Sequence, residues 1–375
     1  MAAIANKKFR VLIVDDSAFM RKVLETILNA DAQLQVVGQA KDGREAVTLA
    51  ESLKPDVITM DINMPHVDGL QATAQIMTTA PRPIVIVSSE SREGAASTLK
   101  ALELGAIEFV AKPSSGIDLD MQSVKEELLR KVRMAAKVRV VRTASRLAST
   151  VQAIKDVTAP AAPRVAPRVQ QAPPLDQRFP IVVLGASTGG PATVMSLAPG
   201  FTRDFPAAVF LVQHMPATFT TQYAAQLAEF TSIRVKEAEP NEPVQPGTLY
   251  ICPGAQHLRI TPTGRIQLDG TSGRINGYLP CIDATMETAA AYAGAMTIGV
   301  VLTGMGNDGA AGAKAIQSAG GLVIAQDEAT AVIFGMPAEA IKAANIEHVL
   351  ALDDIYAAIE KRVIGICRPA PVGAK

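Results

Sequence analysis

The sequence predicts an α/β protein with two parallel-sheet domains joined by a linker. Short apolar runs alternate with amphipathic segments in two blocks of the 375 residues, and a proline-rich stretch separates the blocks. Strands that alternate with helices form a parallel sheet, because each helix carries the chain back to the same edge. Hydrophobic residues make up 48% and charged residues 19%. The chain can therefore bury two cores and is not disordered as a whole.

Five apolar runs in the first block are the expected strands of one sheet. The strands are expected at 9–14, 34–37, 57–60, 84–87 and 107–110. The helices are expected at 18–29, 44–52, 70–78, 95–104 and after Asp118. A five-stranded parallel sheet with a helix after every strand is the flavodoxin-like arrangement.

The second block repeats this alternation in a larger, mostly parallel and doubly wound domain. Its core strands are expected at 181–184, 208–212, 298–302 and 322–325. Short strands with many turn residues occupy 233–268, and we expect an antiparallel excursion there. Residues 288–307 carry no charge over a membrane-spanning length, but they contain four glycines. We interpret them as a helix end and a buried strand at 297–303, with no membrane insertion.

A basic segment between the blocks is hidden by a net charge of zero. Lys and Arg number 36, as do Asp and Glu, yet residues 130–178 hold 11 basic and 2 acidic residues. This segment is rich in proline, which blocks helix formation, so we expect a solvated linker rather than a site for an anionic partner. We divide the chain into a first domain over 7–125, a helix end and linker over 126–178, and a second domain over 179–366.

The composition also restricts the partners and the compartment. Zero net charge disfavours a strongly basic nucleic-acid binder, and no nucleic-acid partner is expected. Three cysteines in 375 residues form no disulfide framework, and the first ten residues hold no apolar signal core. These features indicate a cytoplasmic protein.

Polar residues stand at the ends of four strands of the first block. Asp15 and Asp16 follow the first strand and Asp61 the third, while Ser88 and Lys112 follow the fourth and fifth. The carboxyl ends of parallel strands share one edge, and three carboxylates there stay ionised only beside a cation. Oxygen ligands suit Mg²⁺, and a carboxylate beside Mg²⁺ can take up a phosphoryl group. A flavodoxin-like fold with surface acids at its strand ends is the alternative.

These residues lie in segments that resemble two-component receiver domains. The segments are VLIVDDS at 11–17, MDINMP at 60–65 followed by DG at 68–69, Ser88-Ser89 and Lys112-Pro113. The resemblance spans about residues 9–123 and implies that Asp61 accepts phosphate from a sensor histidine kinase. The resemblance also implies that Asp15, Asp16, Asp61 and the Asn63 carbonyl hold Mg²⁺. It implies Ser88 as the switch hydroxyl and Lys112 as the phosphate partner.

A tight turn after the first strand of the second block exposes a serine. Residues 185–189 read GASTG, which fits the G-x-S-x-G pattern, and their small side chains allow a sharp strand-to-helix turn around Ser187. A phosphate-binding loop or a plain turn is the alternative. No Gly-Lys-Ser/Thr follows, and serine stands where a dinucleotide fingerprint has its second glycine. Ser187 is therefore a candidate nucleophile.

A serine hydroxyl needs a base, and the base needs an orienting acid. His214 follows the next predicted strand and lies beside the serine if the two strands are neighbours. Asp308 follows another apolar strand, in a glycine-rich turn where one of the accessible backbone amides, that of Met305 among them, can donate to an oxyanion. Asp283 and Asp327 are rival acids, although Asp283 is expected to cap the following helix.

Three segments of the second block resemble the chemotaxis protein-glutamate methylesterase family. They are GASTGG at 185–190, QHMP at 213–216 and LTGMGNDG at 302–309. The likeness covers about residues 179–364. It implies a phosphorylation-activated serine hydrolase that releases methanol from glutamate methyl esters on methyl-accepting chemotaxis receptors and deamidates receptor glutamines, with no cofactor for the esterase. The residues that it implies are Ser187 as nucleophile, His214 as base, Asp308 as orienting acid, Thr188 as a site neighbour and the Met305 amide as oxyanion donor.

One departure from the family and several alternatives remain. Cys281 stands where the family usually has serine, and we interpret it as a small buried side chain. The same chemistry would serve a hydrolase of another chemosensory system, because a site does not encode its partner. A non-catalytic receptor-docking regulator is a further alternative, whereas an acidic output block without a helix-turn-helix pattern disfavours DNA binding. In our interpretation the receiver face covers the active site until phosphate on Asp61 moves it.

Overall fold

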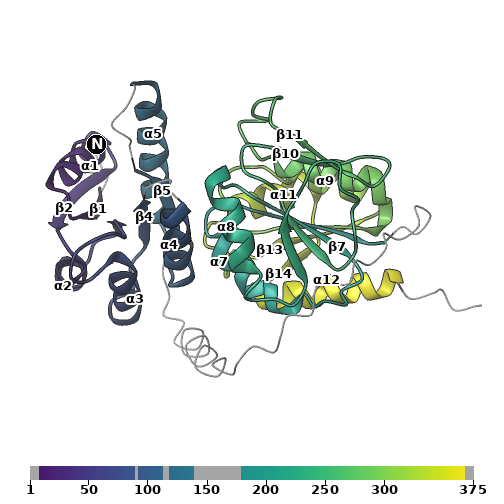
Figure 1. The fold of residues 1–375 in the computed structure, drawn as a ribbon, viewed down its shortest axis with the longest axis horizontal. Helices are drawn as coiled ribbons and strands as arrows, with labels where there is room; N and C mark the ends of the chain where they lie inside the picture. The colour runs from purple at the N-terminus through teal and green to yellow at the C-terminus, as the bar shows by residue number, and fades with distance from the viewer. Residues whose placement is uncertain (1–7, 89–91, 113–117, 139–178, 368–375) are drawn as a thin grey trace, which may run out of the picture.

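The computed structural model describes residues 8–88, 92–112, 118–138 and 179–367, which form two α/β units (Figure 1). The smaller N-terminal unit packs against the larger C-terminal unit, with helix α4 (Arg92–Glu103) facing α7 (Gly190–Leu197) and α8 (Ala217–Leu227). Most of the expected linker, together with Ser89 and Pro113, lies outside the described residues.

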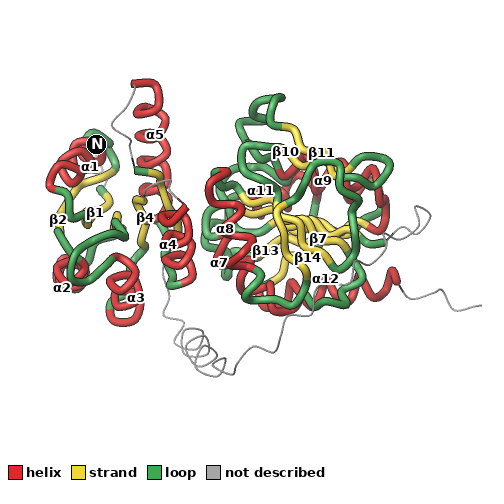
Figure 2. The backbone as a smooth tube through the Cα atoms, viewed as in Figure 1, coloured by secondary structure: helices red, strands yellow, loops and turns green. Residues whose placement is uncertain are grey.

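The N-terminal unit is a five-stranded parallel sheet in the order β2-β1-β3-β4-β5 (Figure 2). Its strands are β1 (Phe9–Val14), β2 (Leu34–Ala40), β3 (Val57–Met60), β4 (Ile84–Ser88) and β5 (Glu108–Ala111). Besides α4, its helices are α1 (Ala18–Asn29), α2 (Gly43–Leu53), α3 (Gly69–Thr79) and α5 (Asp118–Ala135). The flavodoxin-like sheet is confirmed, and α5 continues past residue 125, where we placed the end of the first domain.

Both faces of this sheet are covered, which explains the apolar runs of its central strands β1, β3 and β4. Val11 and Ile13 of β1 belong to a core with α1 and α5, whereas Leu12 and Val14 belong to a core with α2 and α3. All four side chains are at most 1% exposed. Alternate residues of a strand point to opposite faces, so a strand that is buried on both faces has no polar side.

The C-terminal unit holds a seven-stranded parallel sheet in the order β14-β13-β12-β6-β7-β9-β8 and a separate antiparallel pair, β10-β11. Its strands are β6 (Ile181–Ala186), β7 (Ala208–Gln213), β8 (Arg234–Glu237), β9 (Thr248–Ile251), β10 (His257–Ile260), β11 (Ile266–Asp269), β12 (Thr297–Val301), β13 (Leu322–Gln326) and β14 (His348–Leu350). Besides α7 and α8, its helices are α9 (Ile282–Ala293), α10 (Ala310–Ser318), α11 (Met336–Ala344) and α12 (Leu352–Cys367), with 3-10 turns at Ala198–Gly200 and Gly294–Met296.

The strand order places a binding crevice at β6. The chain runs outward from β6 through β7 on one side and returns to β12 on the other. In an open parallel sheet, ligands bind beyond the carboxyl ends of the strands where the order reverses. The loops that follow β6, β7 and β12 therefore meet at this point.

The antiparallel excursion expected over 233–268 is wrong for its first half. β8 and β9 join the main sheet in parallel, while β10 and β11 form the antiparallel pair. Residues 238–247 join β8 to β9 without a helix, so the turn residues that suggested antiparallel pairing belong to a crossover loop. The uncharged stretch 288–307 forms the end of α9 and strand β12. Among the described helices, none is long and apolar enough to cross a membrane.

Candidate active site

Backbone hydrogen bonds join the three loops at the carboxyl edge of the larger sheet. The Ser187 amide donates to the Thr303 carbonyl (3.0 Å), and the His214 amide donates to the Ala186 carbonyl (3.1 Å). Ser187 follows β6, His214 follows β7, and Asp308 lies in the loop after β12. The three candidate residues therefore follow neighbouring strands, which is the condition that the sequence analysis set for His214 to lie beside Ser187.

The turn around Ser187 depends on glycine. Gly189 has φ of +75°, and the Gly190 amide donates to the Ser187 carbonyl at 2.8 Å. A Cβ atom at Gly190 would lie 2.2 Å from Gln213 Oε1, and one at Gly304 would lie 2.8 Å from Ser187 Cβ. These close approaches let the loop after β12 lie directly against the serine.

His214 and Asp308 form a hydrogen-bonded pair. The distance from His214 Nε2 to Asp308 Oδ2 is 2.8 Å, and Asp308 is 1% exposed. Its carboxylate also accepts hydrogen bonds from the backbone amides of Ile282 (2.8 Å) and Asp283 (3.0 Å) at the start of α9. Burial alone would raise the pKa of Asp308, but the hydrogen bond from His214 and these amides outweigh it and hold the pKa below its usual value.

This pairing defines the roles of the two imidazole nitrogens. An ionised carboxylate can only accept hydrogen bonds, so Nε2 of His214 carries the proton that it donates to Asp308. Nδ1 is then the nitrogen that can take a proton from a hydroxyl. Within the described residues, no hydrogen bond joins Ser187 Oγ to His214, and such contacts commonly tighten when substrate binds.

Asp283 does not cap its own helix, contrary to our expectation. The N-cap of α9 is Cys281, and the carboxylate of Asp308 receives the first amides of that helix. Asp283 instead accepts a hydrogen bond from the Gly312 amide at 2.7 Å, and burial raises its pKa to about 6. The other rival acid, Asp327, bonds to Thr330 of its own loop.

The Cys281 thiol is a donor to the acid of the pair. Its Sγ lies 3.2 Å from Asp308 Oδ1, and the side chain is fully buried. Burial, and then the charge of Asp308, raises the pKa of this thiol to about 12. A thiol that remains protonated is a poor nucleophile, so the interpretation of Cys281 as a small buried residue fits its surroundings.

Thr188 follows the serine, and Met305 follows Gly304, which lies against Ser187. Met305 lies in the loop after β12 with its side chain 41% exposed, and in the described part of the chain its amide donates no backbone hydrogen bond. Thr188 is buried, and its hydroxyl donates to Glu108 Oε2 of the N-terminal unit at 2.7 Å. The residue beside the candidate nucleophile is thus tied to the other unit.

The carboxylates of the first unit also converge. Ligand oxygens of Asp15, Asp16 and Asp61 lie within 4.8 Å of one another, and an all-oxygen set of this kind fits Mg²⁺. Lys112 Nζ lies 2.7 Å from Asp61 and 3.0 Å from Asp15. Burial raises the pKa of Asp61, and the hydrogen bond from Lys112 offsets this only in part. Burial would lower the pKa of Lys112, but its two carboxylate partners leave the pKa raised.

The two remaining residues implied by the receiver resemblance flank this cluster. Ser88 is buried at the end of β4, and its hydroxyl donates to the Gly94 carbonyl of α4 at 3.5 Å. Asn63 is exposed in the loop after β3, two residues beyond Asp61. The cluster therefore lies at the end of the sheet where α4 begins. This helix is the one that faces the C-terminal unit.

Sequence reasoning missed Tyr278 and Glu108. The Tyr278 ring stacks on His214, with centroids 4.8 Å apart and planes at 16°. Tyr278 stands in a loop with no periodic pattern. An aromatic residue that follows Asn276-Gly277 and precedes Pro280 was nevertheless a usable signal of a turn that presents a side chain. Glu108 opens an apolar strand, and nothing in its local sequence indicates a partner in the other unit.

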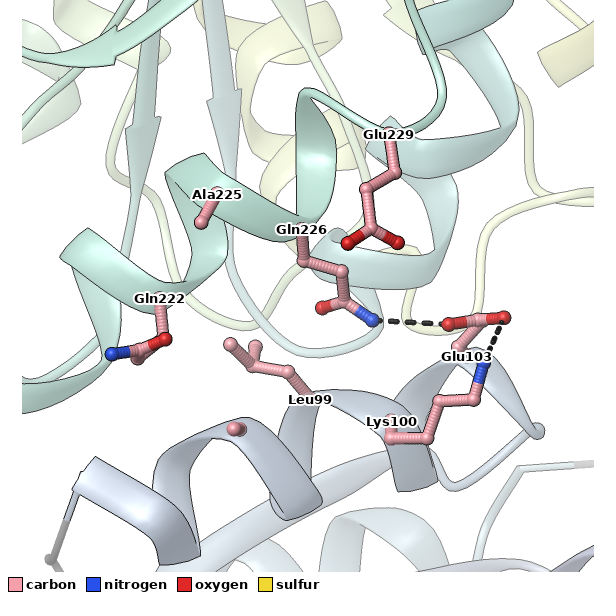
Figure 3. Close-up of a pocket in the computed structure, with 8 residues that line it drawn as sticks. Leu99, Lys100, Glu103, Gln222, Ala225, Gln226 and Glu229 are labelled. Atoms are coloured by element: carbon pink, nitrogen blue, oxygen red, sulfur yellow. Dashed lines mark hydrogen bonds and ion pairs between the residues drawn. The ribbon is translucent and has the colours of Figure 1, made fainter. Parts of the chain in front are cut away.

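A helix-rich interface joins the two units. Phe109 of β5 stacks on Phe219 of α8 with ring centroids 4.3 Å apart. A pocket of about 230 Å³ lies between α4 and α8, and Gln226 Nε2 donates to Glu103 Oε2 across it at 3.1 Å (Figure 3). The N-terminal unit thus contacts α8, the helix that follows the His214 loop.

The fold and its two polar clusters define a receiver domain joined to an α/β output domain. Residues 11–123 match the family model of the response regulator receiver domain, and residues 182–359 match that of the CheB methylesterase. The protein-glutamate methylesterase/protein-glutamine glutaminase of Pyrococcus horikoshii is 41% identical over 362 residues, which cover 96% of this chain and 94% of the relative. The enzyme of the same description from Thermotoga maritima is 42% identical over 348 residues, covering 92% and 96%. The chain belongs to this methylesterase family.

Proposed function

We propose that this protein is a phosphorylation-activated serine hydrolase that removes methyl groups from glutamate methyl esters on chemoreceptors. The same site would deamidate receptor glutamines, since an amide carbonyl accepts the same attack. The support is the name shared by relatives that align over nearly the whole chain and the arrangement of the Ser187, His214 and Asp308 loops. This activity would serve adaptation in chemotaxis.

The proposed reaction uses the three residues in sequence. Ser187 Oγ attacks the ester carbonyl while His214 Nδ1 takes the hydroxyl proton, and the imidazolium that forms is stabilised by Asp308. The Met305 amide donates to the developing oxyanion. Collapse of the intermediate breaks the ester bond, the proton passes from His214 to the leaving oxygen, and methanol departs. Water, activated by His214, then hydrolyses the acyl-serine to regenerate Ser187 and the glutamate.

The hydrogen-bonded pair of His214 and Asp308 beside the serine turn is the observation that carries this proposal. The test is methanol release from methylated receptor by the wild type and by Ser187→Ala. We expect the variant to lose about 10⁴-fold or more in rate while it still binds receptor. A variant that retains wild-type release would contradict the assignment, and a protein that binds receptor without any release would be the non-catalytic regulator.

We also propose that Asp61 is the phosphorylation site and that a chemotaxis-type sensor histidine kinase supplies the phosphate. Mg²⁺ would be held by Asp15, Asp16, Asp61 and the Asn63 carbonyl, and it would neutralise charge on the phosphoryl group. Lys112, whose Nζ lies 2.7 Å from Asp61, would pair with the phosphate, and the Ser88 hydroxyl would donate to it. The esterase site itself is proposed to need no cofactor.

Control of the esterase would act through the interface. Thr188 is bound to Glu108, and Phe109 stacks on Phe219, so the N-terminal unit restrains the neighbourhood of Ser187. Phosphate on Asp61 would shift the β4, α4 and β5 face and weaken these contacts. The proposed domain limits are 7–125 and 179–366, with a helix end and a linker over 126–178. Three free cysteines support a cytoplasmic location.

A further inference from the structure

We propose that Tyr278 is a positioning residue that holds the His214 imidazole by its face while Asp308 holds it by its edge. This inference rests on the proposed function, because it assigns a role within the same site. A ring bound at one nitrogen alone can still turn about that hydrogen bond. A flat contact on its face removes this freedom and keeps the second nitrogen available to the serine.

Tyr278 contacts both the His214 ring and the loop that carries Asp308. Its ring lies nearly parallel to His214, with centroids 4.8 Å apart and an angle of 16°. Its hydroxyl lies 3.4 Å from both the amide nitrogen and Oδ1 of Asn307, the residue before Asp308. A Cβ atom at Gly306 would fall 1.9 Å from the tyrosine hydroxyl, so this approach requires glycine there.

The segment that carries Tyr278 is itself fixed. Ile275 and Tyr278 exchange two backbone hydrogen bonds, of 3.0 and 2.9 Å. Asn276 and Gly277, the residues between them, have φ of +51° and +89°, which is typical of a tight two-residue hairpin. His257 is fully buried, and its Nε2 is 2.8 Å from the Gly273 carbonyl at the base of the segment. The tyrosine is therefore presented on a short hairpin whose first end is held by His257.

The stack also suits the charge that develops during reaction. When His214 takes the serine proton, it becomes a cation that lies against the face of an aromatic ring. A cation is attracted by that face more strongly than a neutral imidazole is. Tyr278 thus acts on the step in which the imidazolium forms, and its removal should lower kcat more than it raises KM.

The test compares Tyr278→Phe and Tyr278→Leu in the full-length protein, with methylated receptor, a small phosphodonor and Mg²⁺. Phenylalanine keeps the stack and loses the hydroxyl contacts, so we expect kcat within about 3-fold of wild type. Leucine loses the ring, and we expect kcat to fall about 10- to 100-fold with KM within about 2-fold. Tyr292→Leu, which removes a tyrosine ten residues beyond the start of α9, is the matched control and should keep wild-type kcat.

Proton NMR of the His214 ring gives a readout independent of turnover. The wild type and Tyr278→Phe should show an upfield ring-current shift that Tyr278→Leu lacks. The inference is overturned if Tyr278→Leu retains kcat, or if Tyr278→Phe falls as far as leucine while the ring-current shift persists. Absence of methanol release by the wild type would refute the proposed function instead, so the two failures are distinct.

Discussion

At the scale of single residues, the charge on Asp308 is what organises the candidate site. A carboxylate that is 1% exposed incurs a large desolvation cost unless donors surround it. Here the amides at the start of α9 donate to it, and the positive end of that helix favours an anion. The anion in turn fixes which nitrogen of His214 bears the proton.

Replacement of Asp308 tests this role. Asp308→Asn keeps the shape but adds an amide donor, so it favours the wrong tautomer of His214 and disturbs the amides of α9. We expect methanol release to fall about 10⁴-fold. Asp327→Asn, which changes an acid bound to Thr330 in its own loop, should remain within about 2-fold. Similar losses in both variants would show that Asp308 is not the specific orienting acid.

Asp283 makes stability depend on pH. Burial raises its pKa from 3.8 to about 6, so the folded state binds the proton more tightly than the unfolded state. Its contribution to stability is complete below about pH 4 and is lost as the pH rises through about 6. In Asp283→Asn this loss disappears, so the variant should gain up to about 3 kcal/mol on the wild type between pH 4 and 7. Urea unfolding across this range measures the difference, and a flat difference would contradict the assignment.

The candidate nucleophile, base and acid could be predicted because Ser187 and His214 directly follow apolar strands and Asp308 lies in the glycine-rich loop after a third. Sequence position alone then brings Ser187, His214 and Asp308 to one edge of the sheet. Tyr278 could not be found in this way, because its place against His214 depends on a hairpin anchored by distant residues. The cap assigned to Asp283 was wrong because Asp308, 25 residues further along, already receives the amides of that helix.

At the scale of elements, the turn after β6 needs glycine at position 189 for two reasons, its backbone conformation and the space beside it. Gly189 has φ of +75°, and a Cβ there would lie 2.6 Å from Val332 Cβ. The predicted strand ends lie within three residues of the observed ones, since buried parallel strands are continuous apolar runs. The parallel pairing of β8 and β9 was not predictable, because a crossover loop without a helix has the turn residues of a hairpin.

Gly189→Ala tests whether this turn is conformationally required. Alanine must adopt a left-handed conformation against Val332, so we expect a loss of about 1–3 kcal/mol in unfolding free energy and a marked drop in methanol release. Gly365→Ala is the matched control, because that glycine lies in α12 and a Cβ atom added there would meet nothing within 4 Å. It should stabilise the protein by up to about 1 kcal/mol. Equal effects at both positions would contradict the requirement.

At the scale of the whole molecule, the interface between α4 and α8 lies between the carboxylate cluster of Asp15, Asp16 and Asp61 and the candidate active site. Gln226 of α8 donates to Glu103 of α4, which also pairs with Lys100 of its own helix. The sequence indicated two domains and a regulatory arrangement. It did not indicate which residues meet, because interface partners share no local pattern.

Charge changes at Gln226 test whether this contact restrains the enzyme. Gln226→Glu places a carboxylate against Glu103, and the weakened interface should raise the activity of the unphosphorylated protein by roughly 2- to 10-fold. Gln226→Lys offers Glu103 an opposite charge and should leave this activity unchanged or lower. The restraint is refuted if both variants shift activity in the same direction.

The most direct test of the account is the rate of methanol release from methylated receptor, with and without a small phosphodonor and Mg²⁺. We predict release by the wild type that the phosphodonor increases, an increase that Asp61→Asn abolishes, and no release by Ser187→Ala. Two results would contradict the claim that a phosphate-sensing domain here controls a serine esterase. One is no release both with and without the phosphodonor, and the other is release that does not depend on Ser187.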